Sequence, residues 1–157
     1  MSGGAEPQFW LIKSEPDVFS IADLQRVGVE PWSGVRNYQA RNYMWKQMRV
    51  GDLCLFYHSN AQPPGIAGLA RVASTPYPDE TQWQEDSEYF DPRSTRETPR
   101  WWLVDVAFER RFDELIPLQR LREMAELEGW ALLQKGTRLS IVPVSPQHFS
   151  HIMSEAL

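Results

Sequence analysis

Apolar residues form five short runs that have the composition and spacing of β-strands. The runs are rich in aromatic and β-branched residues, and turn-forming residues punctuate their ends. Residues 100–112 alternate apolar and polar positions, which predicts a half-buried strand, whereas residues 53–58 are almost continuously apolar, which predicts a buried one. The predicted strands span residues 9–13, 53–58, 66–74, 100–112 and 139–144.

Four other segments repeat apolar residues every three or four positions, as helices with one buried face do. The first follows Ser20, carries Asp23 at the capping-box position and stops at Gly28. The third begins at Pro117, a residue expected in a first helical turn. The predicted helices cover residues 21–27, 38–49, 117–125 and the segment from Ser145-Pro146 to Met153, and residues 30–37 form a loop.

The helices are scattered among the strands rather than alternating with them. This arrangement predicts an α+β fold, built on a small β-barrel of about five or six strands flanked by helices. Residues 75–99 carry four prolines and many acids, so we expect a long irregular excursion there, for which a lid is one role. Residues 1–8 are predicted to form a flexible leader and residues 9–157 a single domain.

The composition limits the class of protein. The apolar runs are far shorter than the roughly 20 residues that cross a bilayer, so no membrane partner is expected. The N-terminus lacks the pattern of a secretory signal, and the lone Cys54 fits a reducing compartment, so we expect an intracellular protein, cytoplasmic or nuclear. The net charge of −5 argues against coating nucleic acid by charge alone and leaves only a local basic surface.

Catalytic signatures are not found in the sequence. It has no nucleophile elbow, phosphate loop, dinucleotide fingerprint or zinc-protease helix, so neither catalytic residues nor a cofactor are expected. His148 and His151 stand three residues apart, a spacing that two metal ligands use, but no third ligand is indicated. We therefore expect no metal site.

Trp32 is unusual because it lies in an otherwise polar loop. Two interpretations stay open: a plug of the core, or a plate on which a ligand stacks. Arg36, Asn37, Tyr38 and Arg41 follow it closely, and cations, amides and aromatic rings are the groups that recognise nucleobases. Asn37 has a simpler interpretation as a helix cap.

Polar side chains also cluster where predicted strands end. Residues 13–16 (KSEP) end the first strand, and residues 57–60 (YHSN) end the second. Residues 135–140 (KGTRLS) combine cations, hydroxyls and a glycine before the last strand. A solvated strand end explains the first cluster equally well and a turn the second, so these clusters alone do not establish a site.

Several longer motifs closely resemble the EVE domain family. They are WLIKSEP at 10–16, WSGVRNYQARN at 32–42, FYHS at 56–59, PGIAG at 64–68, YPD at 77–79, PRW at 99–101 and RLS at 138–140, and the resemblance extends from Phe9 to about Ile152. It implies a PUA-like barrel, the fold that base-binding YTH domains share. The implied function is recognition of a modified base in DNA or RNA.

The resemblance also implies where the base binds. Trp32 is expected to stack on the base, while side chains such as Ser14, Asn37 and His58 bond to its edge. The implied base pocket comprises Lys13, Ser14, Glu15, Pro16, Trp32, Ser33, Gly34, Val35, Asn37, Tyr38, Tyr57, His58, Ser59, Asn60 and Ser140. Our own inference adds phosphate contacts at Arg36, Arg41, Lys135 and Arg138, requires the acidic segment 79–91 to lie away from the pocket, and takes the chain as a monomer.

Two alternatives remain. Some PUA-like proteins hydrolyse amides on modified nucleosides with a lysine, a hydroxyl and a carboxylate, and Lys13, Ser14 and Glu15 invite that comparison. Consecutive strand residues point to opposite faces, however, so the three converge only where a strand ends or bulges. The other alternative is a protein-interaction site in which exposed tryptophans and acids grip a basic partner.

Overall fold

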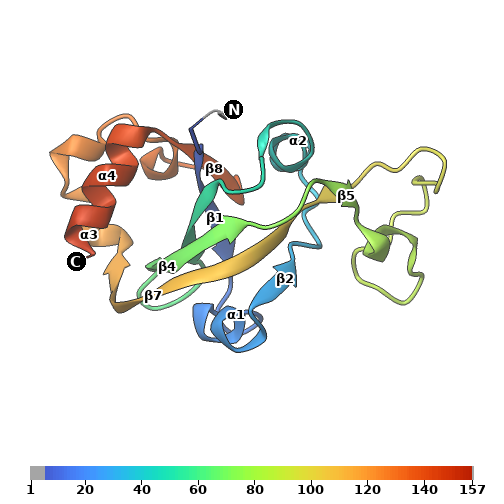
Figure 1. Cartoon of the computed structure of the whole chain (residues 1–157), viewed down its shortest axis with the longest axis horizontal. Coiled ribbons are helices and arrows are strands. Elements are labelled where there is room, and N and C mark those ends of the chain that lie inside the picture. The colour runs from blue at the N-terminus through green and yellow to red at the C-terminus, as the bar shows by residue number, and fades with distance from the viewer. Residues whose placement is uncertain (1–5, 157) are drawn as a thin grey trace.

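The computed structural model describes residues 6–156 and centres on a six-stranded mixed sheet (Figure 1). β1 and β3 are parallel, and the other neighbouring strands are antiparallel. Within the described residues β2 and β8 remain as edges, so the predicted barrel is a curled half-barrel. In spatial order the strands are β2 (Val29–Pro31), β7 (Asp105–Pro117), β4 (Gly65–Val72), β3 (Leu53–His58), β1 (Phe9–Ser14) and β8 (Ile141–Val144).

Helices and an irregular excursion lie at opposite ends of this sheet (Figure 1). Helices α3 (Leu118–Arg122) and α4 (Pro146–Glu155) cover one end, with 3-10 turns at Ala125–Leu127 and Ala131–Leu133. The excursion between β4 and β7 contains β5 (Tyr77–Pro78), a 3-10 turn (Glu80–Trp83) and β6 (Trp102–Leu103). Helix α1 (Ile21–Val27) follows β1, and α2 (Tyr38–Asn42) precedes β3. No helix within residues 6–156 is long and apolar enough to cross a membrane.

The local sequence signals explain where α1 and α4 begin. The Ser20 side chain accepts a hydrogen bond from the backbone N–H of Asp23, and the Asp23 carboxylate accepts one from the backbone N–H of Ser20, which confirms the predicted capping box. Gly28 then ends α1 at a φ of 85°. Ser145 caps α4 through the backbone N–H of His148. Both helices therefore begin directly after a serine whose hydroxyl accepts a hydrogen bond from a backbone N–H of the first helical turn.

Three predicted elements differ in detail. The helix predicted over residues 38–49 is α-helical only to Asn42 and continues as a π-helix (η1, Tyr43–Gln47), because Met48 N–H bonds to the carbonyl of Tyr43 five residues back. The strand predicted over residues 100–112 is divided, since Trp102–Leu103 pairs with β5 and β7 begins at Asp105. Pro117 caps α3 rather than lying in its first turn.

The predicted leader and the domain meet at Gln8. Its backbone N–H bonds to the Asp52 carboxylate at 3.0 Å, and its side-chain amide bonds to the carbonyl of Gln47 at 2.7 Å. Gln8 is therefore bonded to the folded domain, although the predicted leader included this residue. Residues 1–5 of that predicted leader lie outside the described residues.

Alternate residues of β1 and β3 enter two hydrophobic clusters on the two faces of the sheet. Ile12 and Phe56 join the first cluster, together with Trp32 from the loop after β2. Leu11 and Tyr57 join the second cluster, which α3 and α4 cover. Because side chains alternate along a strand, the residues that end β1 and β3 are also divided between the two faces.

Candidate functional site

The carboxyl ends of β1 and β3 meet at one edge of the sheet and bring three of the predicted polar clusters together. Ser14 pairs in register with His58, and the backbone N–H of Ser59 bonds to the Ser14 carbonyl at 2.9 Å. On the other side of β1, the Lys13 N–H bonds to the Ser140 carbonyl at 2.9 Å. These residues are half-buried, so the edge, called the strand-end mouth below, keeps polar groups within reach of solvent.

Aromatic rings form the floor of the strand-end mouth on the first face of the sheet. The ring of His58 lies edge-on to Phe56 at 5.8 Å, and Phe56 lies edge-on to Trp32 at 5.7 Å. Phe19 contacts the Trp32 ring from another side at 6.3 Å. Only 8% of Trp32 is exposed, so most of this ring is packed in the core.

His58 is held in one protonation state by its surroundings. Its Nε2 accepts a hydrogen bond from the backbone N–H of Ile21 at 3.1 Å, so the neutral ring carries its proton on Nδ1. Burial, and secondarily the positive charge of Arg111, lower the pKa of His58 below its ordinary value. The strand-end mouth therefore holds a neutral imidazole that accepts a hydrogen bond at Nε2 and carries its donor N–H at Nδ1.

The candidate hydrolytic residues diverge. Lys13 lies on the second face, with its ammonium 6.0 Å from the centre of the Tyr57 ring, and burial lowers its pKa. The Ser14 hydroxyl donates to the carbonyl of Phe19 at 2.5 Å on the first face. Glu15 accepts a bond from the Asn60 amide at 2.7 Å. The lysine, hydroxyl and carboxylate therefore have separate partners.

An open hollow of about 570 Å³ adjoins the strand-end mouth. Its lining includes Pro16 and Asn60 from the predicted pocket, but not Trp32. The remaining lining residues are Asp17, Ala61, Gln62 and Pro64. The structure thus places an open hollow beside the strand-end mouth, with two residues of the predicted pocket in its lining.

The loop after Trp32 packs against the excursion. Gly34 has a φ of +85°, donates its N–H to the Asp79 carboxylate at 2.8 Å and lies so close to the Tyr89 ring that a Cβ there would be 2.7 Å from it. The expectation that the acidic segment lies away from the site is therefore wrong, because residues 79–89 form a wall beside this loop. Val35 packs on the first hydrophobic cluster, whereas Ser33 is exposed.

Two residues of this loop have mainly internal roles. The Asn37 side-chain oxygen accepts from the Ala40 N–H at 3.0 Å, which confirms the interpretation of Asn37 as a helix cap. All five N–H bonds of the Arg36 guanidinium have protein partners, namely the carbonyls of Val35 and Tyr89, the Asp79 carboxylate and the Thr81 hydroxyl. This geometry favours a structural role for Arg36 over the predicted phosphate contact.

The other predicted phosphate ligands are more accessible. Lys135 and Arg138 are exposed in the loop before β8, whose position next to β1 sets this loop at the same sheet edge as the strand-end mouth. Arg41 lies farther along, over the ring of Tyr38 at 4.6 Å, and 48% of Tyr38 is exposed.

The histidines of α4 have neighbours other than a metal set. His148 lies 6.2 Å from the Trp130 ring, and His151 Nε2 lies 3.5 Å from the Glu126 carboxylate. Among residues 6–156 there is no group of three or more His, Cys, Asp or Glu side chains placed to hold a metal ion.

Three aromatic residues of the site were not predicted from the sequence as neighbours of Trp32 or Gly34. Phe19 and Phe56 surround Trp32 from other elements, and Tyr89 supports Gly34 from the excursion. Phe56 was expected only as part of a buried strand. The glycine beside Trp32 was the one indirect sign of a close neighbour, because glycine permits a close approach of another chain segment.

Comparisons with known proteins agree with this architecture. The EVE domain family model matches residues 8–155. Human thymocyte nuclear protein 1 is 38% identical over 164 residues, which cover 92% of this chain and 72% of that protein. A solved Pseudomonas putida protein is 46% identical with a TM-score of 0.92, covering 95% of this chain and 99% of its own.

A second solved structure carries a ligand. Human THYN1 in complex with 5-methylcytosine containing DNA is 38% identical to this chain, with a TM-score of 0.89 over 95% of this chain and 97% of that one. The family match covers nearly the whole chain, and the curved sheet and its flanking helices agree with the PUA-like fold of these relatives. The chain belongs to the EVE domain family.

Proposed function

We propose that this protein is a non-catalytic module that binds a modified base in DNA at the strand-end mouth, with 5-methylcytosine as the first candidate. The observation that carries the proposal is the likeness, over nearly the whole chain, to a human relative crystallised with 5-methylcytosine containing DNA. The diverging partners of Lys13, Ser14 and Glu15 support binding over amide hydrolysis.

The aromatic floor supplies the apolar part of recognition. Extruding a base from a duplex costs a few kcal/mol, and stacking on an aromatic ring returns about 1–3 kcal/mol. The small exposed part of Trp32, with Phe19 and Phe56 around it, offers an apolar surface to a base and its methyl group. The open hollow next to this floor gives the sugar and neighbouring atoms room to enter.

The rim of the strand-end mouth supplies hydrogen bonds. His58 presents a neutral ring whose Nδ1–H pairs with an acceptor on the base, such as a carbonyl oxygen or an unprotonated ring nitrogen. The Ser14 hydroxyl, which donates its proton to the Phe19 carbonyl, adds an acceptor. The hydroxyls of Ser59 and Ser140 add groups that both donate and accept, and Asn60 adds an amide. The exposure of Lys135 and Arg138 in the loop before β8 supports contacts of these cations with phosphates next to the extruded base.

The proposal is tested by the ratio of affinities for two DNA duplexes that differ only in one methyl group. Wild-type protein is expected to prefer the 5-methylcytosine duplex. His58→Ala should weaken binding of that duplex about tenfold, the equivalent of about 1.4 kcal/mol for one lost bond inside the pocket. The matched control is His148→Ala near the start of α4, which follows the end of β8 that pairs with the start of β1, away from the strand-end mouth, and this variant should bind as wild type.

Two results contradict the proposal. Equal affinity of wild-type protein for both duplexes would remove the modified base as ligand, and an unchanged affinity of His58→Ala for the 5-methylcytosine duplex would remove the strand-end mouth as its site. A matching pair of RNA oligonucleotides decides between DNA and RNA. The predicted monomeric state is checked by sedimentation with and without the bound duplex.

A further inference from the structure

Four aromatic side chains form two stacked pairs on the surface between α2, η1 and β6. Tyr38 stacks on Trp101 with ring centres 4.8 Å apart and 18° between the planes. Trp45 stacks on Trp102 at 4.9 Å and 8°. Tyr38 is exposed, whereas its partner Trp101 is buried. Trp45 and Trp102 are both half-buried, so the first pair borders solvent through Tyr38 and the second through both rings. Large aromatic rings at a surface mark an interaction site more often than isolated aliphatic residues do.

Cations lie on these rings rather than on carboxylates. The Arg41 guanidinium lies 4.6 Å from the Tyr38 ring centre and 5.3 Å from that of Trp45, and the Lys46 ammonium lies 4.9 Å from Trp45. Arg100 approaches the Tyr38 hydroxyl at 3.4 Å and accepts a bond from Arg41 through its carbonyl at 2.7 Å. We call these three cations and the four rings the aromatic-backed cation surface.

The cations of this surface have no direct ion-pair partners among the described residues. Within residues 6–156, none of Arg41, Lys46 and Arg100 forms an ion pair, in contrast to several other arginines that bond to acids: Arg26, Arg36, Arg71, Arg93, Arg96 and Arg120. An aromatic face orients a cation through its quadrupole but adds no negative charge. Arg100 acts only at longer range on the Asp91 carboxylate, whose pKa it helps to lower. A chain with a net charge of −5 therefore keeps a local group of cations without direct ion-pair partners.

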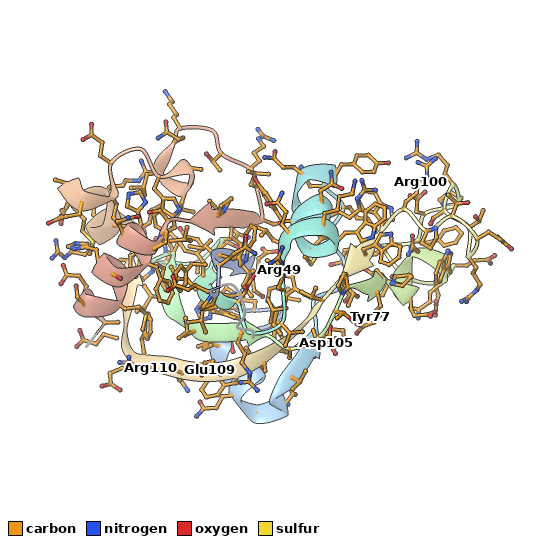
Figure 2. The ribbon with its side chains drawn as sticks, turned by 45° about the horizontal axis from the view of Figure 1, so that its top comes forward. Arg49, Tyr77, Arg100, Asp105, Glu109 and Arg110 are labelled. Carbon is orange, nitrogen blue, oxygen red and sulfur yellow. The ribbon has the colours of Figure 1, made fainter. Side chains whose placement is uncertain are left out.

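This surface is continuous with the loop that borders the strand-end mouth. Trp101 contacts both Arg36 of that loop, at 5.2 Å, and Arg41 of α2, at 5.9 Å. Asn37 of the same loop caps α2, so the loop leads directly into the helix that carries Tyr38 and Arg41. Figure 2 shows Arg100 at the excursion end of the molecule, with its side chain directed outward.

We propose that the aromatic-backed cation surface binds backbone phosphates of the nucleic acid on one side of the captured base. The identity of the ligand rests on the proposed function. Charge complementarity carries the choice of a polyanion, and the spread of cations along one surface suits successive phosphates. These contacts position the strand without reading its sequence or modification.

The test is the salt dependence of duplex binding in Lys46→Gln/Arg100→Gln. Each lost phosphate contact lowers the slope of log affinity against log salt by about 0.9, so the double variant should lose about 1.8 in slope. Affinities for methylated and unmethylated duplexes should fall by the same factor, which leaves their ratio unchanged. The control is Arg71→Gln/Arg120→Gln, which removes one positive charge from β4 and one from α3. It changes the net charge by the same amount and should keep the wild-type slope.

Each outcome is decisive once circular dichroism shows that both double variants are folded. A wild-type slope in Lys46→Gln/Arg100→Gln would overturn the proposal, and so would an equal loss in the control pair, since net charge alone would then explain it. Loss of the methylation preference with the slope intact would assign these cations to the base site instead. A wild-type protein without any preference, but with the slope loss confined to Lys46 and Arg100, would contradict the base-reading function and leave this surface supported.

Discussion

The two ends of the molecule are ordered by different means. At the helical end, Leu121, Phe149 and Ile152 pack apolar side chains onto the sheet. At the excursion end, a chain with little regular structure is held by buried polar side chains, of which Gln82 is 0% exposed and Asp79 1%. Order therefore does not require periodic apolar residues, because side chains that bond to the backbone fix a loop equally well.

Gln82 is the centre of the polar network. Its side-chain oxygen accepts from the N–H of Trp101 at 3.0 Å and from the Ser94 hydroxyl, and its amide donates to the carbonyls of Asp79 and Trp101 at 2.8 Å. Asp91 adds a bond to the indole of Trp101 at 2.8 Å. The excursion thus forms a fixed wall that supports Gly34 and Arg36. A lid was the role that its composition had allowed.

Replacing Gln82 by Leu should give the largest effect. The side-chain volume is nearly kept, but several buried backbone groups lose their partners, so the free energy of unfolding should fall by about 3 kcal/mol or more. Leu121→Ala is the comparison at the helical end, where a cavity costs about 2–5 kcal/mol. Urea denaturation measures both. A near-neutral Gln82→Leu would show that apolar packing, and not hydrogen bonding, orders the excursion.

Arg36→Gln distinguishes a structural arginine from a phosphate ligand. The change removes the cation that pairs with the buried Asp79 carboxylate. It also removes the guanidinium that packs on the Tyr89 and Trp101 rings, so the free energy of unfolding should fall by about 2 kcal/mol. The salt slope of DNA binding should stay as in wild type. Unchanged stability together with a slope reduced by about 0.9 would instead make Arg36 the phosphate contact that its sequence position predicted.

Gly34→Ala measures how closely the wall approaches the loop. Gly34 and Gly129 have φ values of +85° and +87°, but only at Gly34 would the new Cβ meet another group, the Tyr89 ring. Gly129→Ala is therefore the control, and both alanine variants carry backbone strain of about 1 kcal/mol. Thermal unfolding should show a further loss of about 1 kcal/mol in Gly34→Ala alone. Equal losses would mean that the wall yields without cost.

The pH dependence of stability tests the state of His58. Because the folded pKa is lowered from the model-peptide value of 6.5, the unfolded chain binds the proton more readily. The stability that His58 contributes is complete above pH 6.5 and is lost as the pH falls through the folded pKa. The difference in unfolding free energy between wild type and His58→Ala should therefore shrink below pH 6.5, and a difference that stays constant through this range would contradict a lowered pKa of His58.

The sequence predicted the elements whose signals are local. The strand ends at Ser14 and His58 and the capping box at Ser20 and Asp23 lie as expected, because alternation and capping depend on neighbours a few residues away. The meeting of the 13–16, 57–60 and 140 clusters followed from the family resemblance. The pairing of β1 with β3 and β8 brings these clusters to one sheet edge, and their role as a base pocket stays a prediction.

The parts that were missed depend on distant partners. The fixed wall depends on Arg36, whose side-chain acceptors Asp79 and Thr81 lie 43 and 45 positions away. Trp32 is buried by Phe19 and Phe56 from two other elements. Neither composition nor periodicity reveals such contacts. The half-barrel likewise depends on whether edge strands pair, which no single segment encodes.

Tryptophan indole resonances offer the most direct test of base capture at the strand-end mouth. The chain has seven tryptophans, with Trp32 on the floor of that mouth and Trp130 at the helical end, where its indole bonds to the carbonyl of Pro143. Titration with a 5-methylcytosine duplex should shift the Trp32 signal, the unmethylated duplex should shift it much less, and Trp130 should not move. A Trp32 signal that stays fixed while the methylated duplex binds would contradict the account.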